Sequence, residues 1–373
     1  MTTEVLAGPD ERNRERSLPN VYWILFSMLG LAGVIVGFGI GARWLSAGVV
    51  NVTTLASLSG LLLGSALVVL GLRRATAGRR PLARFGLGTA LALVVALIAW
   101  TLTPAVMATY VPPSETDWAS PSGLAINGRE VRFLTSDGVQ LWAWYLPPPQ
   151  GKVVILRHGA GSSASDVIRQ ALVLVANGYG VLMTDARGNG HSEGRAMDFG
   201  WYGDRDIEAA VSFLIAQPEV DAGRIAAMGM SMGGEEAIGA AGADRRIAAV
   251  VAEGATARTA ADKAWLSDEY GWRGWVQVQL ERLQYGFADV LTEAPMPATL
   301  ASAALQASPR PILLITAGLT PDEANAAEHI RLNAAGNVAV WTVPQADHIQ
   351  GLETSPAEWE TKVIGFLDEA LLG

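Results

Sequence analysis

The stretch Arg224–Gly234, RIAAMGMSMGG, decides how this chain is organised. Its apolar half predicts a buried strand, and the residues after Ser231, GGEEAIGAAGA, predict a helix. A strand that turns sharply into a helix at G-x-S-x-G lifts the serine hydroxyl above a sheet, and the helix N-terminus behind it favours negative charge. The sequence therefore predicts Ser231 as a nucleophile.

The pattern G-x-S-x-G occurs a second time, around Ser192. This copy, Gly190–Gly194, lies within the polar loop ARGNGHSEGRAMD, and no helical pattern follows it directly. Since the motif needs a strand before it and a helix after it, we do not expect Ser192 to be a nucleophile.

Strand and helix patterns alternate on both sides of Ser231. The predicted strands are KVVILRH, YGVLMTD, RIAAMGM, AAVVAEG, PILLITAG and NVAVWTV, preceded by the hairpin REVRFLTSDGVQLWAWYLPP. Helices are expected at 165–177, 204–216, after Ser231, at 323–335 and at 356–372. This alternation predicts an α/β fold, a mostly parallel sheet flanked by helices, with its chemistry beyond the carboxyl ends of the strands.

A serine hydroxyl needs a base, and histidine titrates near neutral pH. His348 follows the last predicted strand, in the loop Pro344–His348, and we predict it as the base. His158 and His191 sit in turns after earlier strands, and His329 falls within a predicted helix.

The third member of such a site is a carboxylate that orients the histidine. Asp322, after the strand PILLITAG, is our prediction. Glu323 serves if the loop is one residue longer, and Glu253 is available after the preceding strand. Asp347 is too close in sequence to orient His348 from behind.

Acyl transfer also needs hydrogen-bond donors for the developing oxyanion. The backbone N–H of Met232, directly after the nucleophile, is one predicted donor. Ala160, in the loop His158–Gly161 after the strand KVVILR, is the other.

The last 250 residues or so resemble an α/β-hydrolase, near the dienelactone-hydrolase and prolyl-oligopeptidase-like branches. The resemblance rests on TSDGVQLWAWYLPP, RHGAG, DARGNGHSEG, GMSMGG and ADHIQGL, which occur in the family order. It implies the α/β-hydrolase fold and the order serine, acid, histidine. The departure is at the acid, because Pro321 stands where relatives commonly place Asp.

The resemblance also implies a small cap at about 258–309. This segment holds six aromatic residues, namely Trp265, Tyr270, Trp272, Trp275, Tyr285 and Phe287. Rings over the site would favour an apolar acyl substrate. Alternatively, the rings form only the cap's own small core.

Three stretches of the first third lack charged side chains: Ser17–Ala42, Trp44–Leu72 and Phe85–Ser114. Each holds enough apolar residues to cross roughly 30 Å of hydrocarbon, so we predict three transmembrane helices. Glycines recur at Gly33, Gly37 and Gly41 and at Gly60 and Gly64. They indicate close helix packing, or they reflect only the high frequency of glycine in membrane helices.

Charge predicts the orientation. Residues 1–110 hold 9 Lys and Arg against 4 Asp and Glu, and five of the arginines lie between the second and third stretches. Positive loops stay in the cytoplasm, so the N-terminus, with Arg12, Arg14 and Arg16, is expected inside and the C-terminal part outside. If the second span does not insert, one end changes side.

The expected organisation is thus a cytoplasmic tail at 1–19, a membrane domain at 20–110, a linker at 111–122 and the hydrolase domain at 123–373. The chain has no cysteine, which excludes disulfides, thiolate metal sites and a cysteine nucleophile, and its net charge of −9 argues against nucleic acid as a partner.

We therefore predict a membrane-anchored serine hydrolase that cleaves a small-molecule ester or thioester. Its expected partners are this substrate and the lipid bilayer, and it is expected to require no cofactor or metal. A serine aminopeptidase of the same fold and a non-catalytic membrane protein on a hydrolase scaffold are the alternatives. Neither the substrate nor the oligomeric state follows from the sequence.

Overall fold

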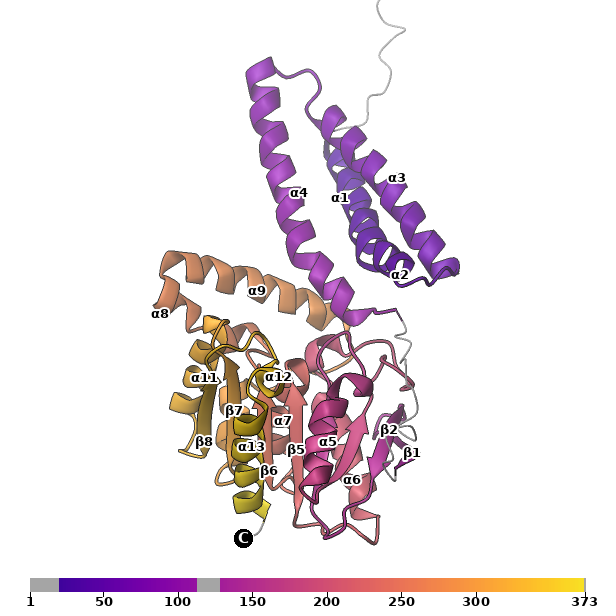
Figure 1. Cartoon of the computed structure of the whole chain (residues 1–373). Coiled ribbons are helices and arrows are strands. Elements are labelled where there is room, and N and C mark those ends of the chain that lie inside the picture. The colour runs from indigo at the N-terminus through magenta and orange to yellow at the C-terminus, as the bar shows by residue number, and fades with distance from the viewer. Residues whose placement is uncertain (1–19, 113–127, 372–373) are drawn as a thin grey trace, which may run out of the picture. The chain divides into compact units, whose positions relative to one another are not determined.

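The computed structural model describes residues 20–112 and 128–371 (Figure 1). The chain divides between Thr103 and Pro104 into two compact units. The predicted tail, most of the predicted linker and the three arginines of the tail lie outside the described residues.

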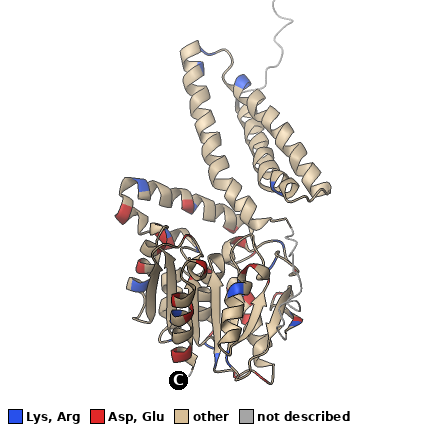
Figure 2. Ribbon diagram, in the orientation of Figure 1, with Lys and Arg blue, Asp and Glu red and all other residues tan. Residues whose placement is uncertain are grey.

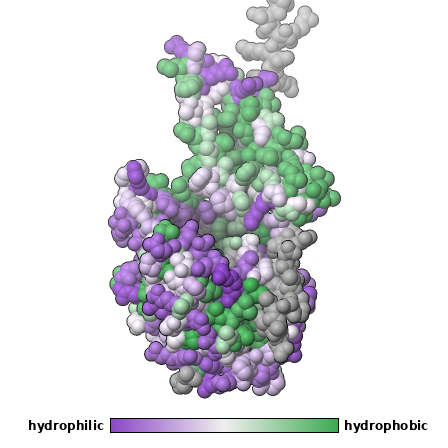
Figure 3. Space-filling model, in the orientation of Figure 1, coloured by the Kyte–Doolittle hydropathy of each residue, from purple (hydrophilic) through white to green (hydrophobic). Residues whose placement is uncertain are grey.

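The first unit is built from long apolar helices, and the last of them continues past Thr103, where this unit ends. Helix α1 (Asn20–Val36) continues through a π-helical turn, η1 (Gly37–Ala42), into α2 (Arg43–Ser46), and α3 (Val52–Ala75) and α4 (Pro81–Thr109) follow. Three spans, Val21–Ser46, Val52–Ala75 and Pro81–Thr109, are long and apolar enough to cross a membrane by length and composition. Figure 3 shows their hydrophobic surface in green.

The helix of the second predicted span begins later than Trp44, the first residue of that predicted stretch. Trp44 belongs to α2, and α3 starts at Val52 because the Asn51 side chain accepts a hydrogen bond from Thr54 N–H at 3.0 Å. An asparagine in this position caps a helix by satisfying one of its first free N–H groups. The polar residues Asn51, Thr53 and Thr54 therefore mark the start of this span.

Glycines bring α1 and α3 together. A Cβ atom on Gly33 would lie 2.7 Å from the carbonyl oxygen of Gly60, and one on Gly30 would lie 2.6 Å from that of Gly64. Such approaches exclude any larger side chain, so these glycines are packing positions. Of the two interpretations of the glycine pattern, the structure favours close helix packing.

The second unit contains one eight-stranded sheet in the order β1-β2-β4-β3-β5-β6-β7-β8. The strands are β1 (Arg129–Leu134), β2 (Gln140–Leu146), β3 (Val153–Arg157), β4 (Gly180–Thr184), β5 (Ile225–Met230), β6 (Ala249–Glu253), β7 (Ile312–Ala317) and β8 (Val338–Val343). The hairpin β1–β2 pairs antiparallel with β4, and all pairs from β4 to β8 are parallel. The predicted α/β alternation is confirmed.

Helices cover both faces of this sheet (Figure 1). On one face lie α6 (Gly203–Ile215), α7 (Met232–Ala243), α10 (Leu300–Ala307) and α11 (Pro321–Asn333), which share a buried cluster with alternate strand residues such as Val153 and Ile155. On the other face, α5 (Ile168–Ala176), α12 (Gly351–Thr354) and α13 (Pro356–Leu371) pack with Val154 and Leu156. Period-two alternation thus divides the apolar residues of each strand between two cores.

The region predicted as a cap holds a 3-10 turn, η5 (Ala260–Lys263), followed by α8 (Leu266–Tyr270), α9 (Trp272–Leu291) and α10. Helix α10 belongs to the sheet's own flank, because its buried residues join the cluster of α7. The aromatic residues are divided as well. Tyr285 is buried and stacks on Trp201, with ring centroids 6.3 Å apart, whereas Trp272 is 73% exposed.

Candidate active site

Ser231 sits in a strained turn between β5 and α7. Its backbone has φ 53° and ψ −123°, a conformation that residues with a side chain rarely adopt. The turn is tight enough that a Cβ atom on Gly233 would lie 2.5 Å from the carbonyl oxygen of His158. Met232 is the first residue of α7, and the Ser231 N–H donates to the Glu253 carbonyl at 2.7 Å. The glycines of the motif therefore allow a turn that presents the serine side chain.

His348 lies in the loop after β8, and its ring faces Ser231. The Ser231 hydroxyl is 2.9 Å from His348 Nε2, although the two residues are 117 positions apart in the sequence. The serine follows β5 and the histidine follows β8, so both stand at the carboxyl ends of parallel strands. The structure brings together these two predicted residues and leaves His191 and His329 out of the group.

Glu323 completes the group. His348 Nδ1 donates to Glu323 Oε1 at 2.6 Å, and Ala317 N–H donates to Glu323 Oε2 at 2.8 Å. The glutamate side chain is almost fully buried, with 2% of its surface exposed. Both of its oxygens are therefore held, one by the histidine and one by the end of β7.

The prediction of Asp322 as the partner of His348 does not match the structure. Helix α11 begins at Pro321, and successive residues of a helix point about 100° apart. Asp322 is therefore exposed, and it accepts a hydrogen bond from Tyr270 Oη at 2.6 Å. Glu323 points inward, and its extra methylene lets the carboxylate reach the ring.

The other two carboxylates that the sequence offered hold the loop around His348. Glu253, only 2% exposed, accepts hydrogen bonds from Gly351 N–H at 2.7 Å and from Trp359 Nε1 at 3.0 Å. Asp347 accepts the backbone N–H of His348 at 2.8 Å. Glu253 thereby ties the end of β6 to the segment that follows the histidine.

Gly254 is a site residue that the sequence analysis missed. Its φ is +71°, and a Cβ atom there would lie 2.8 Å from Cε1 of the His348 ring. Glycine is thus required both by the backbone and by the space that the ring occupies. The only signal in the sequence is its place at the end of the strand AAVVAEG.

The surroundings of His348 stabilise its charged form. The hydrogen bond to Glu323 raises the pKa of His348 above its ordinary value, against the opposite effect of partial burial. Such a ring accepts a proton from a serine hydroxyl more readily than an isolated imidazole does.

The loop predicted to bind an oxyanion, His158–Gly161, passes beside Ser231. A Cβ atom on Gly159 would lie 3.3 Å from the Ser231 Cβ. His158 is fully buried, and its Nε2 accepts the backbone N–H of Ala186 at 2.9 Å while Nδ1 donates to Gly159 O at 2.7 Å. Burial and the neighbouring Arg157 charge lower the pKa of His158 to about 3. His158 is therefore a neutral structural residue that shapes this loop.

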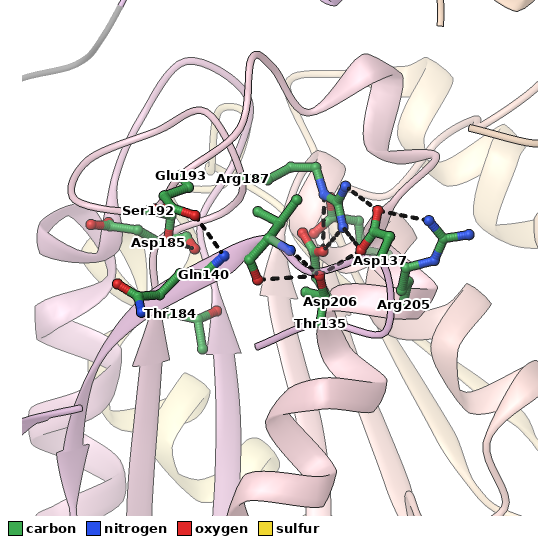
Figure 4. A network of polar contacts seen from close by, with 12 residues as sticks. Thr135, Asp137, Gln140, Thr184, Asp185, Arg187, Ser192, Glu193, Arg205 and Asp206 are labelled. Atoms are coloured by element: carbon green, nitrogen blue, oxygen red, sulfur yellow. Dashed lines mark hydrogen bonds and ion pairs between the residues drawn. The ribbon is translucent and has the colours of Figure 1, made fainter. Parts of the chain in front are cut away.

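The other G-x-S-x-G serine has a structural environment. Ser192 Oγ donates to the Asp185 carbonyl at 2.8 Å and accepts Trp142 N–H at 2.8 Å. Next to it, Glu193 N–H donates to Gln140 O at 2.9 Å, and Glu193 Oε2 accepts Gln140 N–H at 3.1 Å (Figure 4). These bonds attach the loop after β4 to strand β2.

Buried ion pairs support the same end of the sheet. Arg157, directly before the loop, is 2.5 Å from Glu236 on α7 and donates to Thr184 at 3.0 Å. Arg187 bridges Asp206 and Asp137, at 2.5 and 2.9 Å (Figure 4). These contacts connect the end of β3 and the loop after β4 to α6 and α7. Removing one partner of a buried pair would leave an uncompensated charge and loosen this connection.

A cavity of about 400 Å³ opens beside the serine. Its lining includes Gly159, Met230 and His348, together with Arg169, Gln170 and Leu352. Among the described residues, no three His, Cys, Asp or Glu side chains are grouped so as to hold a metal ion.

Known proteins resemble this part of the chain. A family model described as serine aminopeptidase, S33, matches residues 148–299. An esterase from Pyrococcus furiosus superposes with a TM-score of 0.56 at 24% identity, covering 70% of this chain and 98% of the esterase. An α/β hydrolase from Penicillium superposes with a TM-score of 0.50 at 18% identity, covering 66% and 100%. The chain has the α/β-hydrolase fold.

Curated relatives match the same domain. An uncharacterised protein of Mycobacterium tuberculosis is 35% identical over 132 residues, which cover 35% of this chain and 46% of the relative. A thiohydrolase of Aspergillus aculeatus is 37% identical over 130 residues, covering 33% and 40%. The chain thus spans less than half the length of these relatives. Together the matches support a hydrolase, while placement near the dienelactone-hydrolase and prolyl-oligopeptidase-like branches stays a prediction.

Proposed function

We propose that the protein is a membrane-anchored serine hydrolase that cleaves a carboxylic ester or thioester through an acyl-enzyme. The observation that carries this proposal is the continuous hydrogen-bonded row of Ser231, His348 and Glu323, with distances of 2.9 and 2.6 Å. A nucleophile, a base and a group that orients the base are the parts that acyl transfer requires.

In the proposed reaction, Ser231 Oγ attacks the carbonyl carbon of the substrate while His348 Nε2 takes the hydroxyl proton. Glu323 stabilises the imidazolium that forms. The N–H groups of Met232 and Ala160 hold the negative oxygen. Met232 is the first residue of α7, and the first N–H groups of a helix have no intrahelical acceptor, whereas Ala160 lies in the turn after β3.

His348 then gives its proton to the leaving alcohol or thiol, and the acyl group stays on Ser231. Water, deprotonated by His348, attacks the acyl carbonyl and releases the acid. Serine regains its proton, so the cycle ends with the enzyme unchanged and consumes one water.

The relatives and the cavity favour ester or thioester substrates. An esterase and a thiohydrolase are among the similar proteins. The peptidase alternative from the sequence agrees with the description of the family model. An aminopeptidase needs a negative group to pair with the amino group of its substrate. Two carboxylates line the described cavity, and both are engaged: Asp166 accepts Ser163 N–H, and Glu353 pairs with Arg169.

Membrane anchoring rests on the three apolar helices. The arginines of the α3–α4 connection would keep that turn in the cytoplasm and the hydrolase domain outside. Protease added to sealed cells that express a C-terminally tagged chain should remove the tag. Protection until the cells are lysed would place the domain inside.

Labelling with a fluorophosphonate probe tests the chemistry. Membranes with the wild-type chain and with Ser192→Ala should label, whereas Ser231→Ala should not. A panel of p-nitrophenyl esters and thioesters should then be hydrolysed faster than aminoacyl-anilides. Absence of labelling in folded wild-type protein would overturn the hydrolase proposal, and preference for anilides would favour the peptidase.

A further inference from the structure

The turn between α3 and α4 concentrates positive charge without compensation. Its sequence, Leu72–Phe85, LRRATAGRRPLARF, contains five arginines. No acidic residue occurs anywhere between Ser17 and Ser114, so nothing nearby in the sequence neutralises them. Figure 2 shows blue and no red on the described part of these helices.

Three of these arginines share a cavity. A cleft of about 610 Å³ lies where α3 ends and α4 begins, entirely within the first unit. Arg73, Arg79 and Arg84 line its polar part, and Leu72, Phe85 and Ala92 line its apolar part. The cleft therefore has a positively charged end and an apolar wall.

The other two arginines of the turn do not line this cleft. Arg74 lies over the Trp23 ring, 5.5 Å from its centroid, and Arg80 is exposed at the end of the turn. Each of the five arginines carries the same charge, and all lie in the same short segment. The chain thus offers an internal comparison between charge inside the cleft and charge outside it.

Arginine is well suited to phosphate, because its planar guanidinium donates two parallel hydrogen bonds to one phosphate group. Basic pockets between membrane helices near the cytoplasmic surface meet the anionic headgroups of lipids. The apolar wall of Leu72, Phe85 and Ala92 would lie against the acyl chains of the same molecule. A free phosphate ion has no acyl chain that could contact this apolar wall.

We propose that this cleft binds an anionic phospholipid, with the headgroup phosphate held by Arg73, Arg79 and Arg84. The inference rests on the proposed membrane anchoring, and it does not depend on the hydrolase chemistry. It gives the membrane helices a specific lipid ligand in addition to their role as an anchor.

Native mass spectrometry of the detergent-purified full chain tests the proposal, with phosphatidylglycerol and phosphatidylcholine as probes. Wild type should retain phosphatidylglycerol in preference to phosphatidylcholine. Arg73→Gln/Arg84→Gln should bind phosphatidylglycerol at least about tenfold more weakly, because it removes two of the three guanidinium groups and a single charge-assisted hydrogen bond already accounts for about that factor. Arg74→Gln/Arg80→Gln, with the same loss of charge, should bind close to wild type.

Equal losses in the two double variants would overturn the proposal, because they would mean diffuse attraction to positive charge. Displacement of the lipid by millimolar inorganic phosphate would also overturn it, in favour of a simple anion site. Carbonate extraction of membranes separates the two proposals: release of the wild-type chain would refute the anchoring, whereas a retained chain without lipid preference would refute only the site.

Arg73→Lys/Arg84→Lys keeps the charge that orients the spans and should recover part of the affinity.

Discussion

Two loops of this protein carry the same five-residue pattern around serine, and the fold uses them differently. At Gly190–Gly194 the serine hydroxyl both donates to and accepts from backbone groups, of Asp185 and Trp142. At Gly229–Gly233 the hydroxyl faces an imidazole. The first serine secures a loop to the sheet, whereas the second is held by a strained backbone in front of a base. A G-x-S-x-G motif therefore predicts a nucleophile only where a strand precedes it and a helix follows it.

The largest difference between the two serines should appear in turnover. Ser231→Ala should lower kcat for an activated ester by about 10⁴- to 10⁶-fold, since it removes the atom that forms the acyl-enzyme. Ser192→Ala should keep kcat near wild type. Steady-state kinetics on folded, membrane-extracted protein measures both, and a Ser231→Ala enzyme that retains activity would show that Ser231 is not the nucleophile.

The next largest difference in kcat is expected between variants of the two carboxylates at the start of α11. Glu323→Gln should reduce kcat by about 10³- to 10⁴-fold, because an amide cannot stabilise the imidazolium of His348. Asp322→Asn is the matched neighbour, and it should change kcat little, since Asp322 is exposed and accepts a hydrogen bond from Tyr270. A larger loss in Asp322→Asn than in Glu323→Gln would restore the prediction made from the sequence.

Gly254→Ala tests how strongly kcat depends on the position of the His348 ring. The new methyl group would meet the His348 ring and should lower kcat by up to about 100-fold, the cost of misplacing a catalytic group by about 1 Å. Gly365→Ala is a suitable control, because a Cβ atom there meets nothing within 4 Å. Equal activity in the two variants would mean that the ring can move without loss.

The structural role of Ser192 should appear in stability. Ser192→Ala removes the hydroxyl that bonds to both the Trp142 N–H and the Asp185 carbonyl, which should lower the free energy of unfolding by about 1–3 kcal/mol. Thr361→Ala removes an exposed hydroxyl on α13 and should have a small effect. Urea denaturation followed by tryptophan fluorescence compares them. If Ser192→Ala is as stable as Thr361→Ala, the structural role of Ser192 is refuted.

The smallest expected effect is a shift in pH dependence. His348 must be neutral to act as a base, so kcat/KM should rise as pH rises through its pKa. The hydrogen bond to Glu323 raises that pKa above 6.5, so the acid limb of wild type should lie above 6.5. In Glu323→Gln the residual activity should show this limb at lower pH. An unchanged limb would mean that another group titrates.

The helix start at Pro321 explains where the sequence fell short. The alternation of strands and helices, the strand–turn–helix context of Ser231 and the position of His348 after the last strand are local patterns, and each is present in the structure where it was predicted. The choice between Asp322 and Glu323 depends on the direction in which each side chain leaves α11. Neighbouring residues of a helix face different surroundings, so a spacing rule along the chain cannot decide it.

The same division holds across the molecule. The apolar spans, the excess of arginine beside them and the α/β order can be recognised in the sequence alone, because hydropathy, charge and periodicity are properties of neighbouring residues. Tertiary structure alone decided that Glu253 ties β6 to the loop after His348, that Gly254 makes room for the ring, and that Arg73, Arg79 and Arg84 share a cleft while Arg74 does not. These contacts join residues whose distance in space is set by how strands and helices pack, and periodicity along the chain carries no record of it.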